Sequence, residues 1–256
     1  MSEPAILRES RGDVAVIRLN RPQAKNSLRL DDIRWLHREI RSIAALPARC
    51  LMLTGAGDAF CAGRDLKEME PERNDALAVL AELINPLILD LRQLPIPTLA
   101  AIRGPALGLG LGLALACDVS LVAENAVLGS PFRSIGCVLD SGGHFFLAER
   151  LGPHRAAELI FTGRLLSGRE AAAIGLVNRA VPALTLAGES EKIAADIAAG
   201  PTASFRASKE ILARPRQLAD VLELEAKFQA AALESHDGRE GIRAFQEKRK
   251  PQFVGA

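Results

Sequence analysis

The sequence predicts an α/β fold in which a sheet flanked by helices is followed by a helical carboxy-terminal region. From Ala5 to about Ser130, short apolar runs typical of strands alternate with segments whose apolar residues recur at helical spacing. Beyond Ser141 almost every segment has a helical pattern, with Gly or Pro residues between segments. No low-complexity linker divides the two parts. We therefore expect one core, residues 1–195, and a helical region suited to self-association, residues 196–256.

The expected strands are short runs of β-branched and aliphatic residues. The first two, Ile6–Glu9 and Val14–Leu19, are separated by Arg11-Gly12-Asp13, which is typical of a hairpin turn. Helical patterns lie between most of the later runs, and this repeated alternation favours a sheet with helices packed beside it. The later strands are expected at Cys50–Thr54, Thr98–Ile102, Val119–Val122 and Val127–Gly129.

The first helix is expected over Asp31–Leu46, because Ile33, Leu36, Ile40 and Ile43 have the spacing of an amphipathic helix. A second helix is expected over about residues 75–94, between two strands. The carboxy-terminal helices are expected at Gly143–Leu151, Pro153–Thr162, Gly168–Ile174, Ala183–Ala199, Thr202–Leu212, Arg216–Glu234 and Gly238–Gln246.

The composition excludes several classes of partner. The chain has 32 basic and 31 acidic residues, and this balance gives no support for binding to nucleic acid or to a membrane surface. The amino terminus lacks a basic segment followed by an apolar core, and the apolar stretch Leu107–Cys117 is too short to span a bilayer. We therefore expect a cytoplasmic protein. Its four cysteines occur singly, which predicts buried, reduced thiols and no metal site: Cys50, Cys61, Cys117 and Cys137.

Two glycine-rich loops, Gly55–Leu66 and Arg103–Gly112, each follow an expected strand. Such loops can direct backbone N–H groups from two places at one oxygen atom, which is how an oxyanion hole is built. Glycine allows the close approach that this arrangement requires. The run Gly108–Gly112 could instead be only a helix start packed against the sheet. Neither loop matches a phosphate-binding fingerprint.

Several stretches follow one another over nearly the whole chain: Leu19–Leu28, Phe60–Leu66, Pro95–Ala106, Ala116–Asp118, Gly142-Gly143, Leu151-Gly152, Leu159–Gly163, Gly175–Val177 and Phe245–Lys250. Together, and in this order, they resemble the crotonase superfamily of enoyl-CoA hydratases and isomerases. The resemblance implies a spiral of ββα turns with a carboxy-terminal helical region for trimerisation, assembled as a homotrimer or a dimer of trimers. It also implies an acyl-CoA substrate and no cofactor beyond its CoA group.

In this family two peptide N–H groups hold the thioester oxygen, and the resemblance assigns them to Arg64 and Leu109. Lys25 and Arg29 have the charge to meet phosphate oxygens of CoA, although each basic side chain, that of Arg64 included, could be a solvated surface charge. The resemblance implies that Phe245 and Lys248 reach a CoA held by the neighbouring subunit. It implies that the adenine and pantetheine groove is lined by Ala24, Lys25, Arg29, Ala62, Asp65 and Leu66.

The departures from the family pattern concern the acids. Hydratases of this family resemble one another in two glutamates that activate water, and those positions hold Gly112 and Phe132 here. Neither residue can move a proton, so hydration by the two-glutamate mechanism is not expected. Asp140 stands where isomerases of the family carry an acid. One carboxylate suits double-bond migration, because it removes a proton from one carbon and returns it to another.

The sequence around Asp140 is apolar, which predicts a pKa raised by desolvation. Alternatively, Asp140 caps the following helix, since Asp is a favoured N-cap residue. A nucleophilic Asp140 acting on an aryl-CoA would need a second base, which the sequence does not identify. The apolar neighbours are Phe132, Val138, Leu139, Phe145 and Phe146, and the expected substrate pocket comprises Phe132, Leu139, Ser141 and His144.

Three functions follow from these observations. The first is an isomerase of enoyl-CoA, dienoyl-CoA or ring-containing acyl-CoA in which Asp140 is the single acid and base. The second is a hydratase or lyase that holds water in a different way. The third is a protein that binds acyl-CoA and forms oligomers without catalysing a reaction.

Overall fold

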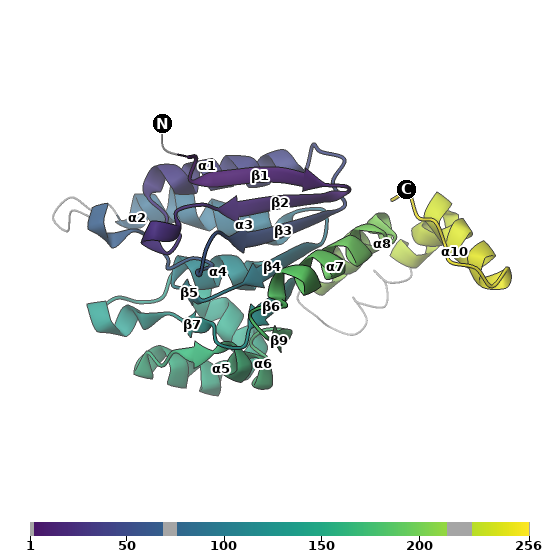
Figure 1. Cartoon of the computed structure of the whole chain (residues 1–256). Helices are drawn as coiled ribbons and strands as arrows, with labels where there is room; N and C mark the ends of the chain where they lie inside the picture. The colour runs from purple at the N-terminus through teal and green to yellow at the C-terminus, as the bar shows by residue number, and fades with distance from the viewer. Residues whose placement is uncertain (1–2, 69–75, 214–226, 256) are drawn as a thin grey trace.

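The computed structural model describes residues 3–68, 76–213 and 227–255 (Figure 1). Its larger sheet has six strands in the order β1-β2-β3-β4-β6-β9. β1 is antiparallel to β2, as the predicted hairpin requires, and every later neighbouring pair is parallel. The strands are β1 (Ile6–Arg11), β2 (Val14–Leu19), β3 (Cys50–Gly55), β4 (Thr98–Ile102), β6 (Val119–Ala123) and β9 (Arg179–Val181).

A smaller sheet contains β5 (Pro105–Leu107), β7 (Val127–Gly129) and β8 (Leu166–Ser167), with β5 parallel and β8 antiparallel to β7. The sequence predicted β7 but not β5, β8 or β9. These three strands are two or three residues long, too short to display an alternating pattern.

The helices of the amino-terminal half pack on one another and on the larger sheet. In α1 (Leu30–Ile43) the four residues that predicted an amphipathic helix are all buried. The helix expected over residues 75–94 is described from residue 76 as α2 (Ala76–Ala78), a π-helical turn (Val79–Ile84) and α3 (Asn85–Gln93). α4 (Leu109–Ala116) is buried along its whole length.

The carboxy-terminal half is helical, as predicted. α5 (Gly143–Thr162) joins two predicted helices across a non-helical residue, Gly152. α6 (Gly168–Ala173) follows, and then α7 (Leu186–Ala198) packs across β2, β3, β4 and β6. The chain continues into α8 (Thr202–Ala213) and α10 (His236–Gln246). Of the helix predicted over Arg216–Glu234, residues 227–234 are helical and the remainder lies outside the described residues.

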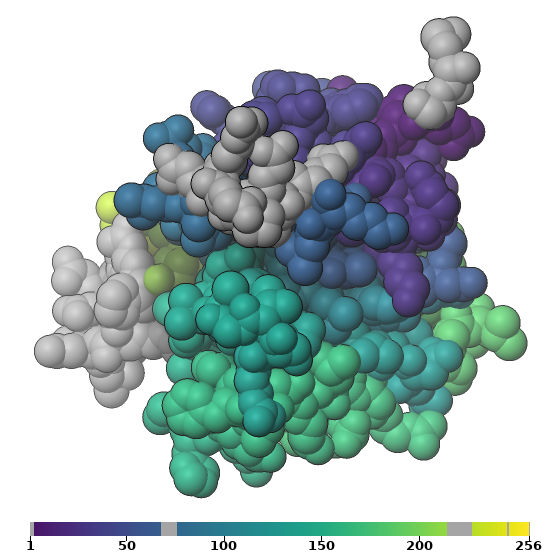
Figure 2. Space-filling model, turned by 90° about the vertical axis from the view of Figure 1, so that its left-hand side faces the viewer, coloured from purple at the N-terminus to yellow at the C-terminus, as the bar shows by residue number. Residues whose placement is uncertain are grey.

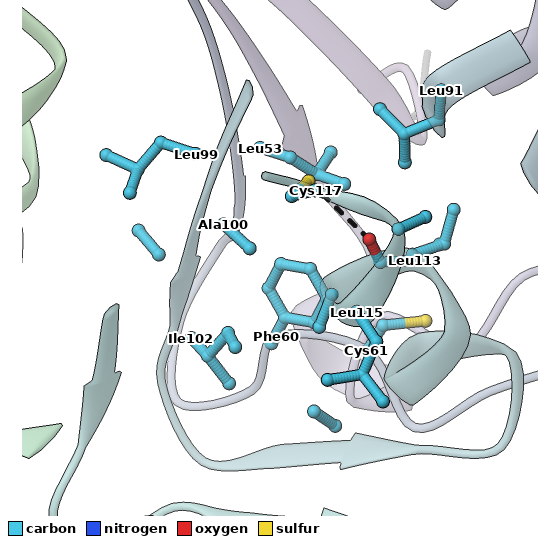
Figure 3. Close-up of a cluster of buried hydrophobic side chains, with 14 of the residues drawn as sticks. Leu53, Phe60, Cys61, Leu91, Leu99, Ala100, Ile102, Leu113, Leu115 and Cys117 are labelled. Atoms are coloured by element: carbon cyan, nitrogen blue, oxygen red, sulfur yellow. Dashed lines mark hydrogen bonds between the residues drawn. The ribbon is translucent and has the colours of Figure 1, made fainter. Parts of the chain in front are cut away.

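The core lies where β3, β4 and α4 meet the first glycine loop, and Figure 3 shows Phe60 of that loop among side chains of these elements. Three of the cysteines, Cys50, Cys61 and Cys117, are buried, and burial raises the pKa of each thiol to about 12. The prediction was wrong for Cys137, which is exposed on the segment after β7. None of the helices in the described ranges is long and apolar enough to cross a bilayer.

The last helices extend away from the sheet, with α10 at the end of the molecule opposite α2 (Figure 1). Two basic side chains attach them to the core. The Arg49 guanidinium donates to the carbonyls of Gly200 (2.5 Å) and Phe253 (3.0 Å). Lys209 Nζ of α8 lies 2.7 Å from Asp118 Oδ2. The division into residues 1–195 and 196–256 stays a prediction.

Candidate active site

Two backbone hydrogen bonds fix the first glycine loop to the segment before α1. The Leu28 N–H donates to the Gly63 carbonyl, and the Asp65 N–H donates to the Leu28 carbonyl, both at 2.9 Å. Arg64 lies between these two residues in a parallel bridge with Leu28. Because successive N–H groups of an extended chain alternate in direction, the Arg64 N–H points away from Leu28.

The second glycine loop lies beside the first. The Cys61 N–H donates to the Pro105 carbonyl (2.9 Å), and the Leu107 N–H donates to the Cys61 carbonyl (3.0 Å). A Cβ atom added at Gly63 would lie 3.7 Å from the Leu109 nitrogen. Leu109 is the first residue of α4, where the N–H group has no carbonyl partner within the helix. The two predicted oxyanion donors therefore come from adjacent pieces of backbone.

Gly110 explains part of the second glycine motif. A Cβ atom there would lie 2.1 Å from the Cys61 carbonyl oxygen, so only glycine lets α4 pack this closely on the first loop. The sequence left open whether the run was merely a helix start. It is a helix start, and that start also carries the Leu109 N–H.

Asn26 joins the two sides of the first loop, and the sequence analysis gave it no role. Its side chain is fully buried, and Nδ2 donates to the carbonyls of Ala56 (2.9 Å) and Ala59 (2.7 Å). Oδ1 accepts from the Arg21 N–H at 2.8 Å. Asn26 has a φ of 55°, a left-handed conformation that Asn adopts more readily than most residues. The signals in the sequence for this position are that tolerance and its place in the family-like stretch Leu19–Leu28.

Several residues predicted to bind CoA lie along one edge of this loop. The Ala62 N–H donates to the Lys25 carbonyl at 2.9 Å, which places the exposed Lys25 beside the loop. Ala24 precedes it in the 3₁₀ turn Pro22–Ala24, and the exposed Leu66 begins the turn Leu66–Glu68. Beyond Lys25, a hollow of about 240 Å³ is lined by Leu30, Asp31, Arg34, Arg64 and Asp65.

Arg29 and Asp65 belong to an internal network of ion pairs. The Arg29 guanidinium makes a two-pronged contact with Asp32, at 2.8 and 2.9 Å. Asp65 accepts from Arg21 at 3.1 Å. Burial opposes ionisation of Asp65, but hydrogen bonds from the Lys67 N–H and from Arg21 outweigh it and lower its pKa. Asp32 thus takes two of the five N–H donors of the Arg29 guanidinium.

The predicted carboxy-terminal pair does not reach this groove within one chain. Lys248 is exposed and follows α10, which projects from the end of the molecule far from α2 (Figure 1). The backbone of Phe245 belongs to α10, while its side chain lies outside the described structure. Contact of these residues with a CoA on a neighbouring subunit stays a prediction.

Asp140 lies on the segment that leads into α5. The N-cap of α5 is Gly142, so Asp140 is not the helix cap that the sequence left open. The Ser141 hydroxyl donates to Asp140 Oδ1 at 2.7 Å. Burial raises the pKa of Asp140, and this effect exceeds the opposing effects of the Ser141 hydrogen bond and the nearby Arg64 charge. The carboxyl is thus desolvated and lies close enough to Arg64 to feel its charge.

The other predicted pocket residues are divided between site, core and surface. A Phe132 ring carbon lies 3.3 Å from a Cβ atom added at Gly108, so this ring covers the start of α4. Ser141 is buried next to Asp140, whereas Leu139 belongs to the hydrophobic core. His144 is exposed. Two residues expected to shield Asp140, Val138 and Phe145, are exposed instead, because the chain directs them outward on either side of it.

These segments meet at the end of the molecule shown in Figure 2, where the teal segment after β7 lies between blue residues above and green residues below. A larger hollow of about 560 Å³ begins at Gly142 and Phe146 and extends between α3 and α8. Asp140, Arg64 and Leu109 are not among the residues that line it. Within the described ranges, no group of three or more His, Cys, Asp or Glu side chains is arranged to hold a metal ion.

The chain is similar to known proteins along nearly its whole length. A family model described as enoyl-CoA hydratase/isomerase matches residues 9–256. The chain is 36% identical over 250 residues to an enoyl-CoA isomerase/hydratase of Mycosarcoma maydis, covering 93% of this chain and 91% of the relative. It is 34% identical over 249 residues to the 1,2-epoxyphenylacetyl-CoA isomerase of Escherichia coli, covering 94% and 95%.

Among solved structures, an enoyl-CoA hydratase from Bacillus anthracis superposes with a TM-score of 0.93 at 36% identity, covering 99% of this chain and 100% of that one. The fold is therefore that of the crotonases, as the sequence predicted. Because the family model matches nearly the whole of this chain, the chain belongs to the enoyl-CoA hydratase/isomerase family.

Proposed function

We propose that the protein is an acyl-CoA double-bond isomerase in which Asp140 is the single acid and base. The Arg64 and Leu109 N–H groups hold the thioester oxygen. The Asp140 carboxylate removes a proton from the α-carbon of a 3-enoyl group, leaving a dienolate whose negative charge lies largely on that oxygen. The same carboxyl then returns the proton to the γ-carbon, giving the 2-enoyl isomer. No water is added, and atoms and charge balance.

The observation that carries this proposal is the desolvated Asp140 carboxyl beside the two glycine loops. A raised pKa makes its carboxylate a stronger base, and the resulting acid can still return the proton. The two positions where the family's hydratases carry glutamates hold Gly112 and Phe132. A reaction that requires only one proton carrier fits these residues better than one that must also activate water.

The names of related proteins support an acyl-CoA substrate but divide between reactions. The E. coli relative is named an isomerase of a ring-containing acyl-CoA, and the B. anthracis structure is named a hydratase. Their identities to this chain are similar, at 34% and 36%. Similarity favours neither reaction, so the proposal rests on the residues. The name of the E. coli relative makes ring-containing acyl groups the first to test after linear ones.

Hydration is the second candidate, because the B. anthracis structure is named a hydratase. Here Asp140 would act on a water molecule held by groups other than the family's glutamates. The two candidates predict different products from the same thioester. A hydratase converts a trans-2-enoyl-CoA to a 3-hydroxyacyl-CoA, whereas an isomerase interconverts 2-enoyl and 3-enoyl thioesters.

The test supplies trans-2-enoyl-CoA and 3-enoyl-CoA separately to the wild type and to Asp140→Asn, with products resolved by chromatography. We expect isomerisation in the wild type and a loss of roughly 10²- to 10⁴-fold in the variant, the usual range for a general acid–base residue. Hydration that survives in Asp140→Asn would contradict the proposed mechanism. Binding of acyl-CoA without turnover of linear or ring-containing thioesters would support the non-catalytic alternative.

We also propose that the protein assembles as a homotrimer or a dimer of trimers and acts in the cytoplasm without a cofactor beyond CoA. The support for assembly is that α10 projects from the core and that Ile242 on α10 and Leu233, shortly before it, are exposed. Light scattering coupled to size exclusion would give the mass directly. A monomer at micromolar concentration would contradict this assignment.

A further inference from the structure

Gly112 lies against the turn that carries Asp140. A Cβ atom added at Gly112 would lie 2.5 Å from both the Cβ and the carbonyl oxygen of Ser141. Real Cβ atoms do not approach other atoms this closely, and one of the two neighbours is backbone. Gly112 is buried inside α4, so a side chain there has no open direction in which to turn. Either α4 or the Asp140–Ser141 turn would have to move.

The turn is held in an unusual conformation at this contact. Ser141 has a φ of 55°, in the left-handed region that few non-glycine residues adopt, and its side chain is 1% exposed. Its hydroxyl donates to Asp140 Oδ1 at 2.7 Å, and the Gly143 N–H donates to the Asp140 carbonyl at 2.9 Å. Packing against α4 thus fixes the residue that holds the carboxylate. Displacing Ser141 would displace the carboxylate with it.

The position along α4 relates this contact to the oxyanion hole. Gly112 follows Leu109 by three residues, so the two lie on neighbouring turns of one helix face, roughly 4.5 Å apart along the axis. The turn that packs on Gly112 therefore lies about one helical turn from the Leu109 N–H. The same helix positions the predicted oxyanion donor and the predicted acid.

We propose that Gly112 is a positioning residue for Asp140, because its missing side chain lets the Ser141 turn dock on α4 and sets where the carboxylate lies. This inference rests on the proposed function of Asp140. It also gives residue 112 a part in the choice of reaction. Any side chain at position 112 would press on Ser141, so the present place of Asp140 depends on the glycine that stands where hydratases carry a glutamate.

The test compares Gly112→Ala with Gly188→Ala as a matched control. At Gly188, inside α7, an added methyl group meets nothing within 4 Å, so we expect no loss of activity. For Gly112→Ala we expect kcat to fall by about 10²-fold, as a misplacement of about 1 Å at a reacting group does. KM is expected to change by less than about threefold, because the groove for CoA lies on the first loop.

A second pair of variants asks whether the effect acts through Ser141. In the Ser141→Gly background the hydroxyl that holds Asp140 is already lost. That background also lacks the Ser141 Cβ contact but keeps the carbonyl contact, so adding Gly112→Ala there should still displace Asp140 but lower kcat by less than the roughly 10²-fold expected in the wild-type background. Equal losses in both backgrounds would overturn the positioning role, because they would mean that α4 itself is damaged.

Crystal structures separate this inference from the proposed function. We expect residues 140 and 141 to be displaced by about 1 Å in Gly112→Ala, whether or not the wild type is an isomerase. If residues 140 and 141 are displaced in Gly112→Ala but the wild type has no isomerase activity, the proposed function is contradicted and the positioning role is not. If the Asp140–Ser141 turn of Gly112→Ala is not displaced and its kcat equals that of the wild type, the positioning role is contradicted and the proposed function is not. If Gly112→Ala does not fold, the Ser141→Gly protein with and without Gly112→Ala gives the comparison, and superposition of Asp140 within about 0.3 Å would overturn the role.

Discussion

The hydroxyl of Ser141 donates a 2.7 Å hydrogen bond to the carboxylate of Asp140, the residue directly before it in the chain. Ser141 is buried and has a left-handed backbone, with a φ of 55°. The hydrogen bond favours the ionised carboxylate, while burial favours the protonated one, and burial has the larger effect. The basicity of Asp140 therefore depends on a balance that single substitutions can shift.

Removing the Ser141 hydroxyl should change the pH dependence of the reaction. Ser141→Ala removes a hydrogen bond that lowers the pKa of Asp140, so we expect that pKa to rise further. Asp140 must be ionised to remove a proton, and the acidic limb of kcat/KM should move to higher pH. Initial rates between pH 4 and pH 9 would measure this. A limb that stays in place, or moves to lower pH, would show that the hydroxyl does not act on Asp140.

Neutralising Asp140 should stabilise the protein while it removes activity. Because burial raises the pKa of Asp140 in the folded chain, its contribution to stability is complete below the unfolded pKa and is lost as pH rises through the folded pKa. The Asn side chain does not ionise, so Asp140→Asn does not lose stability as the pH rises through that pKa. We expect its Tm to exceed the wild-type Tm at neutral pH and the difference to shrink toward zero below about pH 4, near the usual pKa of Asp.

Thermal melts of both proteins at matched protein concentration would check this, since any assembly makes Tm depend on concentration. A variant that is less stable than the wild type at neutral pH would contradict the expectation. In that case the Ser141 hydrogen bond and the Arg64 charge would outweigh burial.

The Leu109 N–H can be removed by proline, because the first position of a helix tolerates that residue. Leu109→Pro also removes a buried side chain, so Leu109→Ala, which keeps the N–H, is the matched control. We expect Leu109→Pro to lower kcat by roughly 10²- to 10³-fold beyond Leu109→Ala, the usual effect of losing one oxyanion donor. Circular dichroism would verify the folding of both. Equal activities would exclude this N–H from the reaction.

Lys25 and Arg29 should respond differently to substitution. Lys25 is exposed beside the first loop, and we expect Lys25→Ala to weaken CoA binding by roughly two- to fivefold, less at high salt, as for an exposed charge pair. Arg29→Ala would leave the buried Asp32 carboxylate without its two-pronged partner, at a cost of about 1–3 kcal/mol in stability.

Titration of CoA by calorimetry and thermal melts would distinguish these two effects. Each variant serves as the control for the other, because Lys25→Ala should leave Tm unchanged. If Arg29→Ala loses CoA affinity without losing stability, the main role of Arg29 is to bind a phosphate of CoA.

Much of the fold could be predicted from local pattern. The strands Cys50–Gly55 and Thr98–Ile102 and the helix Leu30–Ile43 have the periodicity and length that a window of sequence can reveal. The strands Pro105–Leu107, Leu166–Ser167 and Arg179–Val181 could not be predicted, because pairing partners far along the chain make them strands. Val138 and Phe145 were expected inside and are outside, since an apolar residue does not by itself define the direction of its side chain.

For the site, the sequence by itself determined which groups are present: two glycine loops, one acid at position 140, and no carboxylate at positions 112 and 132. Only the tertiary structure decided what these groups do to one another. It joined the loops through backbone pairing and committed Arg29 to Asp32. It also packed Gly112 on Ser141 so closely that an added Cβ atom would lie 2.5 Å from it, a contact between elements that are distant in sequence. In the sequence, Gly112 is notable because hydratases carry a glutamate there. In the folded chain, its missing side chain leaves room for the turn that carries Asp140.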